Sequence, residues 1–149
     1  MTESRGSPHK RLTTEELQGL LETAPQLSPV LKDCAGNMQP PTFSEHLAAL
    51  MDERGLNPSK LGELALLSRS FAYQLCSGIR APSRDVVLRL ALVLKLTPEE
   101  TQRLLRTACR GALYPRVRRD AVFIFALKQG LSLFDANELL CSLSEAPIL

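Results

Sequence analysis

The sequence predicts an all-α fold in which a central domain of five helices carries helical extensions at both ends. Three observations lead to this prediction. Apolar residues recur with the 3.6-residue period of an amphipathic helix almost throughout the chain, and no segment alternates as a strand would. Ser, Thr or Asn precedes most of these segments, in the position of a helix N-cap, and Gly or Pro separates them. With 149 residues, 44% of them apolar, the chain is large enough to bury a core.

Residues 1–41 are expected to hold a polar start, two short helices and a linker. Thr13 can cap the first helix while Glu16 returns a hydrogen bond, as in a capping box. Ser28 is expected to cap the second helix, with Pro29 in its first turn. Two consecutive prolines then end the linker, because they cannot continue a helix.

Residues 42–110 are predicted to form the central domain. Its first helix begins at Phe43, and Asn57, Ser68, Ser83 and Thr97 cap the next four. Gly78 ends the helix that Ser68 begins, because glycine adopts a left-handed turn at no steric cost. The positions expected to face the core in the first three of these helices are Phe43, Leu47, Leu50, Met51, Leu61, Leu64, Ala65, Leu67, Ala72 and Leu75.

Residues 111–149 are predicted to form a two-helix extension whose second helix is capped by Ser132. Ten of the apolar residues in this extension are too many for a lone surface hairpin: Val122, Phe123, Phe125, Ala126, Leu127, Leu131, Leu133, Phe134, Leu139 and Leu140. They could complete the core of the central domain, which we favour slightly, or seal a homodimer through helices 120–143. The arginines of "YPRVRR" (114–119) could contact DNA or RNA, or offset nearby acids.

Composition excludes several classes of protein. The longest apolar runs are too short to span a membrane, and the polar start lacks the apolar segment of a secretory signal. Cys34, Cys76, Cys109 and Cys141 have no zinc or redox spacing, so reduced cysteines in a cytoplasmic protein are expected. Two histidines, His9 and His46, cannot build a catalytic or metal site with them. We therefore expect no enzyme activity, cofactor or metal.

Charge is distributed unevenly along the chain. The net charge is only +2, but residues 12–68 carry −5 and residues 69–119 carry +8, because ten arginines fall in the second segment. The first eleven residues add +2 and the last thirty carry −3. A basic middle between acidic parts suggests a surface for a polyanion. The alternative is an arginine-rich face that is paired with acids within the protein.

The segment "LLSRSFAYQLCSGIRAPS" (66–83) holds the candidate site. Asn57–Leu66 and Ser68–Ser77 are two short helices with almost no loop between them. If their apolar residues face inward, the second helix presents its first turns outward, as a recognition helix does in the major groove. Arginine can bind guanine and glutamine can bind adenine, each through two hydrogen bonds. The residues on this outer face are Arg69, Ser70, Tyr73 and Gln74.

The run of 42 residues from Gly55 to Leu96 resembles the helix-turn-helix of the Xre family, the lambda-repressor and Cro type. It keeps the family's order of Gly-Leu-polar, Leu-Ala, Ser-Arg-Ser, Gly and Arg-x-Pro-Ser features. The resemblance implies that Arg69, Ser70, Tyr73 and Gln74 read bases, with Phe71 at a half-exposed edge. It also implies that the DNA backbone is contacted by Asn57, Lys60, Ser68, Arg80 and Arg84. Ser68 matches a groove-facing position as well.

Three positions depart from the family pattern. Leu66 stands where the turn usually has glycine, so either the turn adapts or Leu66 bears backbone strain. Gly62 replaces an alanine at a close helix contact. Pro58 replaces a residue, often glutamine, that grips phosphate, which weakens the case for DNA binding.

The sequence therefore predicts a sequence-specific, DNA-binding transcriptional regulator whose partner is double-stranded DNA. The alternative is a protein-interaction adaptor on the same fold, which would use the acidic N-terminal helix and the apolar tail to bind a protein partner. Binding of structured RNA is a third hypothesis and depends on the same arginine-rich segment.

Overall fold

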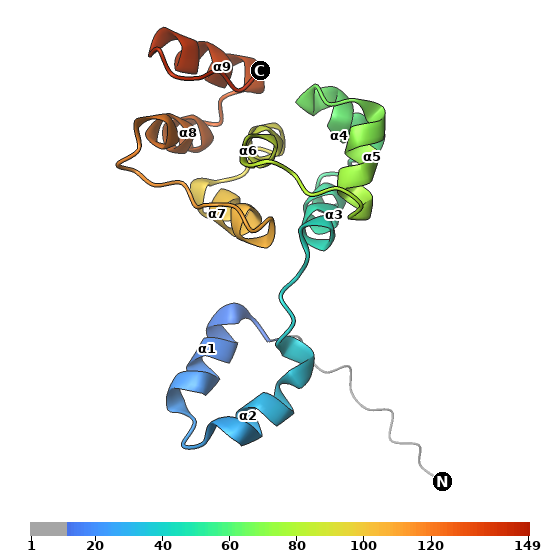
Figure 1. Cartoon of the computed structure of the whole chain (residues 1–149), viewed down its shortest axis with the longest axis vertical. Helices are drawn as coiled ribbons and strands as arrows, with labels where there is room; N and C mark the ends of the chain where they lie inside the picture. The colour runs from blue at the N-terminus through green and yellow to red at the C-terminus, as the bar shows by residue number, and fades with distance from the viewer. Residues whose placement is uncertain (1–11) are drawn as a thin grey trace. The chain divides into compact units, whose positions relative to one another are not determined.

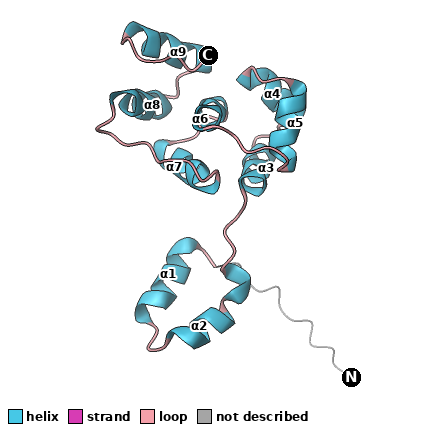
Figure 2. Ribbon diagram, in the orientation of Figure 1, coloured by secondary structure: helices cyan, strands magenta, loops and turns pink. Residues whose placement is uncertain are grey.

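The computed structural model describes residues 12–149, and the polar start, with its predicted charge and His9, lies outside the described residues. The chain divides into two compact units, Met1–Pro40 and Pro41–Leu149 (Figure 1). Over the described residues every regular element is a helix (Figure 2). The prediction of an all-α fold is confirmed.

The described part of the first unit holds α1 (Thr14–Thr23), α2 (Leu27–Asp33) and the 3₁₀ turn η1 (Ala35–Asn37). The capping box of Thr13 and Glu16 is present as predicted. The prediction that Ser28 caps α2 is wrong, because Gln26 is the N-cap and Ser28 lies in the first turn. A proline fits anywhere in a first turn, where its missing N–H would be unpaired. Pro29 therefore marks the start of α2 only to within two residues.

The second unit contains α3 (Phe43–Glu53), α4 (Pro58–Ala65), α5 (Arg69–Ser77), α6 (Arg84–Val93), α7 (Pro98–Thr107), α8 (Arg118–Gln129) and α9 (Leu133–Ser142). Six of these helices begin at a side-chain cap that accepts a hydrogen bond from the backbone N–H three residues later. The capping residues are Thr42, Asn57, Ser68, Ser83, Thr97 and Ser132. All of the caps predicted in this part of the chain are confirmed.

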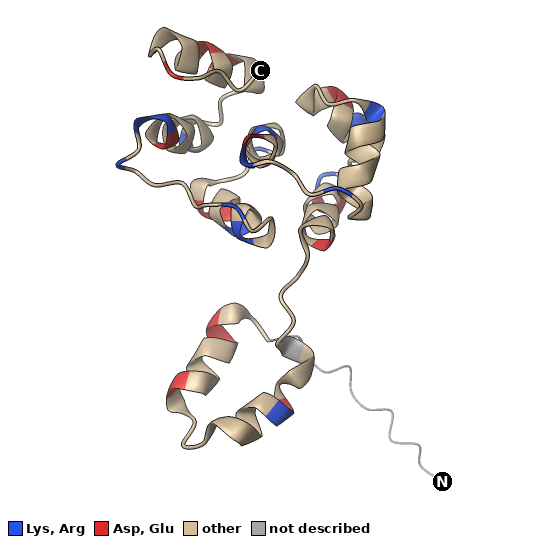
Figure 3. Ribbon diagram, in the orientation of Figure 1, with Lys and Arg blue, Asp and Glu red and all other residues tan. Residues whose placement is uncertain are grey.

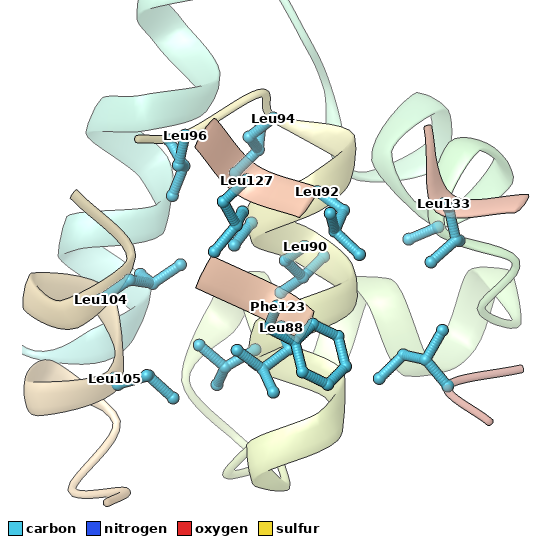
Figure 4. Close-up of a cluster of buried hydrophobic side chains, with 14 of the residues drawn as sticks. Leu88, Leu90, Leu92, Leu94, Leu96, Leu104, Leu105, Phe123, Leu127 and Leu133 are labelled. Carbon is cyan, nitrogen blue, oxygen red and sulfur yellow. The ribbon is translucent and has the colours of Figure 1, made fainter. Parts of the chain in front are cut away.

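Helix α6 is the centre of the core of the second unit. It contacts α4, α7, α8 and α9, and its leucines are buried (Figure 4). Phe123 and Leu127 of α8 and Leu133 and Leu140 of α9 belong to the same cluster as the leucines of α6 and α7. The C-terminal extension therefore completes the core of the central domain.

Several apolar side chains of this unit stay at the surface. Phe125 of α8 and Phe134 of α9 are 54% and 62% exposed. Leu64, which the sequence predicted to face the core, is 42% exposed, so that prediction is wrong. The buried residues of α4 are Leu61, Gly62 and Ala65, and at 100° per residue Leu64 projects on the side of Leu61 that faces away from Gly62 and Ala65.

Candidate nucleic-acid interface

Helices α4 and α5 are joined by a tight turn at Leu66. Leu66 adopts the left-handed conformation, with φ 57° and ψ 39°, so the leucine bears the strain that glycine would avoid. For a residue other than glycine this conformation costs roughly 1–2 kcal/mol. The Leu67 N–H donates to the Gly62 carbonyl at 2.8 Å, which closes the end of α4 and directs the chain into α5.

Gly62 permits the close approach of α4 and α5. A Cβ at this position would lie 2.8 Å from the Cβ of Ala72, which is shorter than carbon atoms tolerate. Both residues are buried. Glycine at this position thus lets the two helices approach more closely than alanine would.

The outer face of α5 carries the residues predicted to read bases. Arg69, Ser70 and Tyr73 are exposed and Gln74 is half-buried, while Ala72 and Leu75 face the core. The Arg69 guanidinium lies over the Tyr73 ring, 5.9 Å from its centroid. Arg69 is the only basic residue within α5 (Figure 3). A cationic side chain that is held along a ring is oriented without losing its hydrogen-bond donors.

Arg80 lies just beyond the end of α5 and contacts two of its residues. Its guanidinium stands 5.4 Å from the centroid of the half-buried Phe71 ring. Its Nη1 donates to Oε1 of Gln74 at 3.4 Å, a long hydrogen bond. The structure thus brings Arg80 to the side chain of Gln74.

Three of the predicted backbone-contacting residues lie at the starts of α4 and α5. Asn57 caps α4, and its Oδ1 accepts from the Lys60 N–H at 2.8 Å. Ser68 caps α5 in the same way, and its Oγ accepts from the Phe71 N–H. The Lys60 ammonium lies 3.6 Å from Glu63 in an exposed pair. Such a pair is worth about 1 kcal/mol or less, so Lys60 can exchange Glu63 for a phosphate.

Arg84 is placed differently from the other predicted contacts. Its guanidinium makes two hydrogen bonds to the Asp120 carboxylate, at 2.8 and 2.9 Å, and two more to the carbonyls of Gly111 and Ala112. The hydrogen bonds that Arg84 donates to Asp120 raise the pKa of Arg84. Four of the five N–H donors of Arg84 are therefore occupied within the protein, and it fastens the C-terminal extension to α6.

Asp120 is the buried partner in this pair. Burial by itself would raise the pKa of Asp120, but the hydrogen bonds from Arg84 and from the Tyr114 N–H outweigh it and lower the pKa. A second pair runs beside the first, because Arg119 donates to Asp85 at 2.9 and 3.2 Å. Neighbouring residues of α6 thus pair with neighbouring residues of α8, with the charges reversed. Arg118 also pairs with an acid, Glu145, at 3.3 Å.

Sequence reasoning missed Arg89, which connects α6 to the turn at Leu66. Its Nη2 donates to the Ala65 carbonyl at 2.7 Å and to the Leu66 carbonyl at 3.0 Å. The feature of the sequence that could have revealed this role is a lone arginine within the apolar run "VVLRLALVL" of residues 86–94. A charged residue in such a run needs polar partners, and the ends of helices offer carbonyls.

Other functional features are few in the described residues. A groove of about 400 Å³ lies next to the end of α5 and is lined in part by Ser44, Arg80 and Arg110. Residues 12–149 contain no group of three His, Cys, Asp or Glu side chains placed to hold a metal ion. None of the described helices is both long and apolar enough to cross a membrane.

Residues 42–104 match the family model of a helix-turn-helix domain. The match covers α3 to α6 and most of α7, including the turn at Leu66 and all of α5. The class of domain is therefore a helix-turn-helix, a fold that characteristically binds DNA. Neither a search of curated proteins nor a search of solved structures found a match to the chain.

Proposed function

We propose that this protein is a sequence-specific, DNA-binding transcriptional regulator of the Xre type that reads the major groove with α5. The observation that carries the proposal is the outer face of α5, where Arg69, Ser70 and Tyr73 are exposed at the helix start while Ala72 and Leu75 anchor it in the core. The helix-turn-helix match supports the same assignment. We propose a cytoplasmic location, as expected from the sequence.

Arg69 and Gln74 would carry most of the base discrimination. Arginine pairs with guanine O6 and N7, and glutamine with adenine N6 and N7. The contact between Arg69 and the Tyr73 ring holds the guanidinium close to α5 before DNA arrives. The hydrogen bond from Arg80 uses one of the two lone pairs of Gln74 Oε1, so the other lone pair can accept from adenine N6 while an N–H of the amide donates to N7.

The residues proposed to contact the DNA backbone are Asn57, Lys60, Ser68 and Arg80. They flank α5 on both sides, at the start of α4, at the start of α5 and just after its end. Asn57 and Ser68 cap their helices through oxygen atoms, so the Asn57 amide and the Ser68 hydroxyl can still donate to phosphate. We leave Arg84 out of this surface because Asp120 and two carbonyls hold its guanidinium.

Selection of binding sites from random duplexes, followed by anisotropy titrations at two salt concentrations, tests the proposal. We expect Arg69→Ala and Gln74→Ala each to cost roughly 1–3 kcal/mol on the selected site and to relax specificity. Lys60→Ala and Arg80→Ala should weaken all duplexes alike and reduce the salt slope by about 1. Unchanged affinity of both α5 variants for the selected site would overturn the assignment of α5 to the groove.

A protein-interaction adaptor is the second candidate, and the exposed Phe125 and Phe134 favour it. These rings lie on α8 and α9, outside the residues that match the helix-turn-helix model. They would also suit a homodimer through helices 120–143. Selection of an inverted repeat with half-sites about 10 base pairs apart would support a DNA-binding dimer. Binding of a protein that persists at high salt, with no selected duplex, would support the adaptor.

A further inference from the structure

Arg89 of α6 holds the turn between α4 and α5 from outside. Arg89 extends from the middle of α6, and its Nη2 bridges the carbonyls of Ala65 and Leu66 at 2.7 and 3.0 Å. These carbonyls belong to the last residue of α4 and to the left-handed residue that follows it. Neither carbonyl accepts a hydrogen bond from an N–H of the helix, because the helix ends here. The guanidinium of Arg89 supplies the missing donor.

This arrangement is maintained against two unfavourable contributions. Leu66 holds a positive φ that leucine rarely adopts, and half of its side chain is exposed, so burial of the side chain does not explain the conformation. The Nε atom of Arg89 is buried and finds no acceptor among the described residues. An orphaned buried donor is tolerated where the other contacts of the same side chain outweigh it.

The neighbours of Arg89 keep its charge in place. Burial lowers the pKa of Arg89, and Asp85, one turn earlier on α6, opposes that shift. Asp85 is itself held by the two hydrogen bonds from Arg119 at the start of α8. A continuous set of polar contacts and charges thus leads from the C-terminal extension through α6 to the turn at Leu66.

We propose that Arg89 is a positioning residue for DNA recognition, which fixes the left-handed turn at Leu66 and so sets the orientation of α5 against α4. This inference deepens the proposed function and rests on it. Arg89 itself need not touch DNA, since its guanidinium is turned toward Ala65 and Leu66. Its effect would be transmitted by the 2.8 Å hydrogen bond from Leu67 to Gly62 and by the close contact of Gly62 with Ala72.

Arg89→Met tests the inference, with Arg106→Met as a control that removes the same charge from an exposed position of α7. Amide exchange at Leu67 should become roughly tenfold faster in Arg89→Met, because the turn loses the partner that offsets its strain. Exchange within α6 should change less than at Leu67. Affinity for the selected duplex should fall about tenfold, with a smaller loss on random duplexes.

Leu66→Gly provides the decisive second variant. Glycine adopts the left-handed turn without strain, so Leu66→Gly combined with Arg89→Met should restore most of the affinity and of the slow exchange at Leu67. The inference is overturned if Arg89→Met behaves like Arg106→Met, or if Leu66→Gly gives no recovery in a chain that remains folded by circular dichroism.

The amide-exchange and DNA-binding measurements together distinguish a failure of this inference from a failure of the proposed function. Amide exchange needs no DNA, so it reports on the turn even if no duplex is selected. Faster exchange at Leu67 with no selected duplex in the unmodified chain would overturn the proposed function and the role of Arg89 in recognition, while establishing the contact at the turn. Selected binding that is insensitive to Arg89→Met would overturn the inference alone.

Discussion

Arg69 and Arg84 occupy equivalent places in two helices, yet their surroundings differ completely. Each is the first residue of its helix, α5 or α6, and each follows a serine N-cap. Arg84 is fastened to Asp120 and to two carbonyls, whereas Arg69 lies exposed along the ring of Tyr73. The same Ser-Arg helix start therefore gives one structural arginine and one that is free for a ligand. The partner that decides between them is 36 residues away from Arg84 in the chain.

The largest expected effect comes from removing that distant partner. Asp120→Ala would leave Arg84 without its carboxylate in a site where only 6% of the Asp120 side chain is exposed. We expect the free energy of unfolding to fall by about 3 kcal/mol, as for other buried pairs that lose one member. Urea unfolding of the variant and of the unmodified chain measures this loss of stability.

Glu145→Ala is the matched control for this variant, because it removes a carboxylate from Arg118, whose side chain is 68% exposed. Its cost should stay below about 1 kcal/mol. If both variants cost the same, the contrast between buried and exposed arginine pairs would be wrong.

A smaller loss is expected where α5 is held by close packing instead of by charge. Gly62→Ala places a methyl group 2.8 Å from the Cβ of Ala72. Overpacking of this kind costs about 2 kcal/mol. Because α5 must shift, binding of the selected duplex should also weaken.

Gly62→Ala combined with Ala72→Gly removes the clash, so the double variant should be more stable than the sum of the single effects indicates. Thermal or urea unfolding of the unmodified chain, the two single variants and the double variant measures the coupling free energy between the two positions. Strict additivity would show that the two residues do not limit the approach of α4 to α5.

Acid should weaken the Arg84–Asp120 pair by less than deletion does. The pKa of Asp120 is lower in the folded chain, so its stabilising contribution is complete above the unfolded pKa of about 3.9 and is lost as pH falls through the folded value. Asp120→Asn should therefore lose less stability than the unmodified chain as pH falls below about 4. Urea midpoints measured along this range test the difference, and parallel curves would contradict it.

The smallest change in stability is expected at Arg69. Arg69→Ala should alter the free energy of unfolding by less than about 0.5 kcal/mol, since the side chain is exposed and lies along the ring of Tyr73, which is exposed too. A stability loss comparable to that of Asp120→Ala would show that Arg69 is structural and would remove the contrast with Arg84.

Much of the fold could be predicted because the determining interactions are local. Caps, capping boxes and glycine stops act within one turn of a helix, and Thr97, Ser68 and Gly78 behave as their sequence positions indicate. The prediction of Ser28 as an N-cap failed because Pro29 marks the first turn of a helix without fixing its first residue.

The site could be predicted only in part because arginine has several equally good partners. The outward face of α5 followed from helical periodicity, and its residues Arg69, Ser70 and Tyr73 are exposed, while Gln74 is half-buried. Whether an arginine of the basic middle is free depends on contacts distant in sequence, such as Arg84 with Asp120 and Arg119 with Asp85. The role of Arg89 depended on a turn that also lies far away in sequence.

The shared core also determines how the helix-turn-helix can be handled as a module. The family match ends at residue 104, but the side chains that cover the leucines of α6 include Phe123 and Leu127 of α8. A fragment that stops at residue 110 would carry the whole recognition helix and yet expose an apolar face on α6, with Arg84 deprived of Asp120. Residues 42–149 should consequently melt in one cooperative transition. Transfer of α4 and α5 into another protein would require α6 and α8 to be transferred as well.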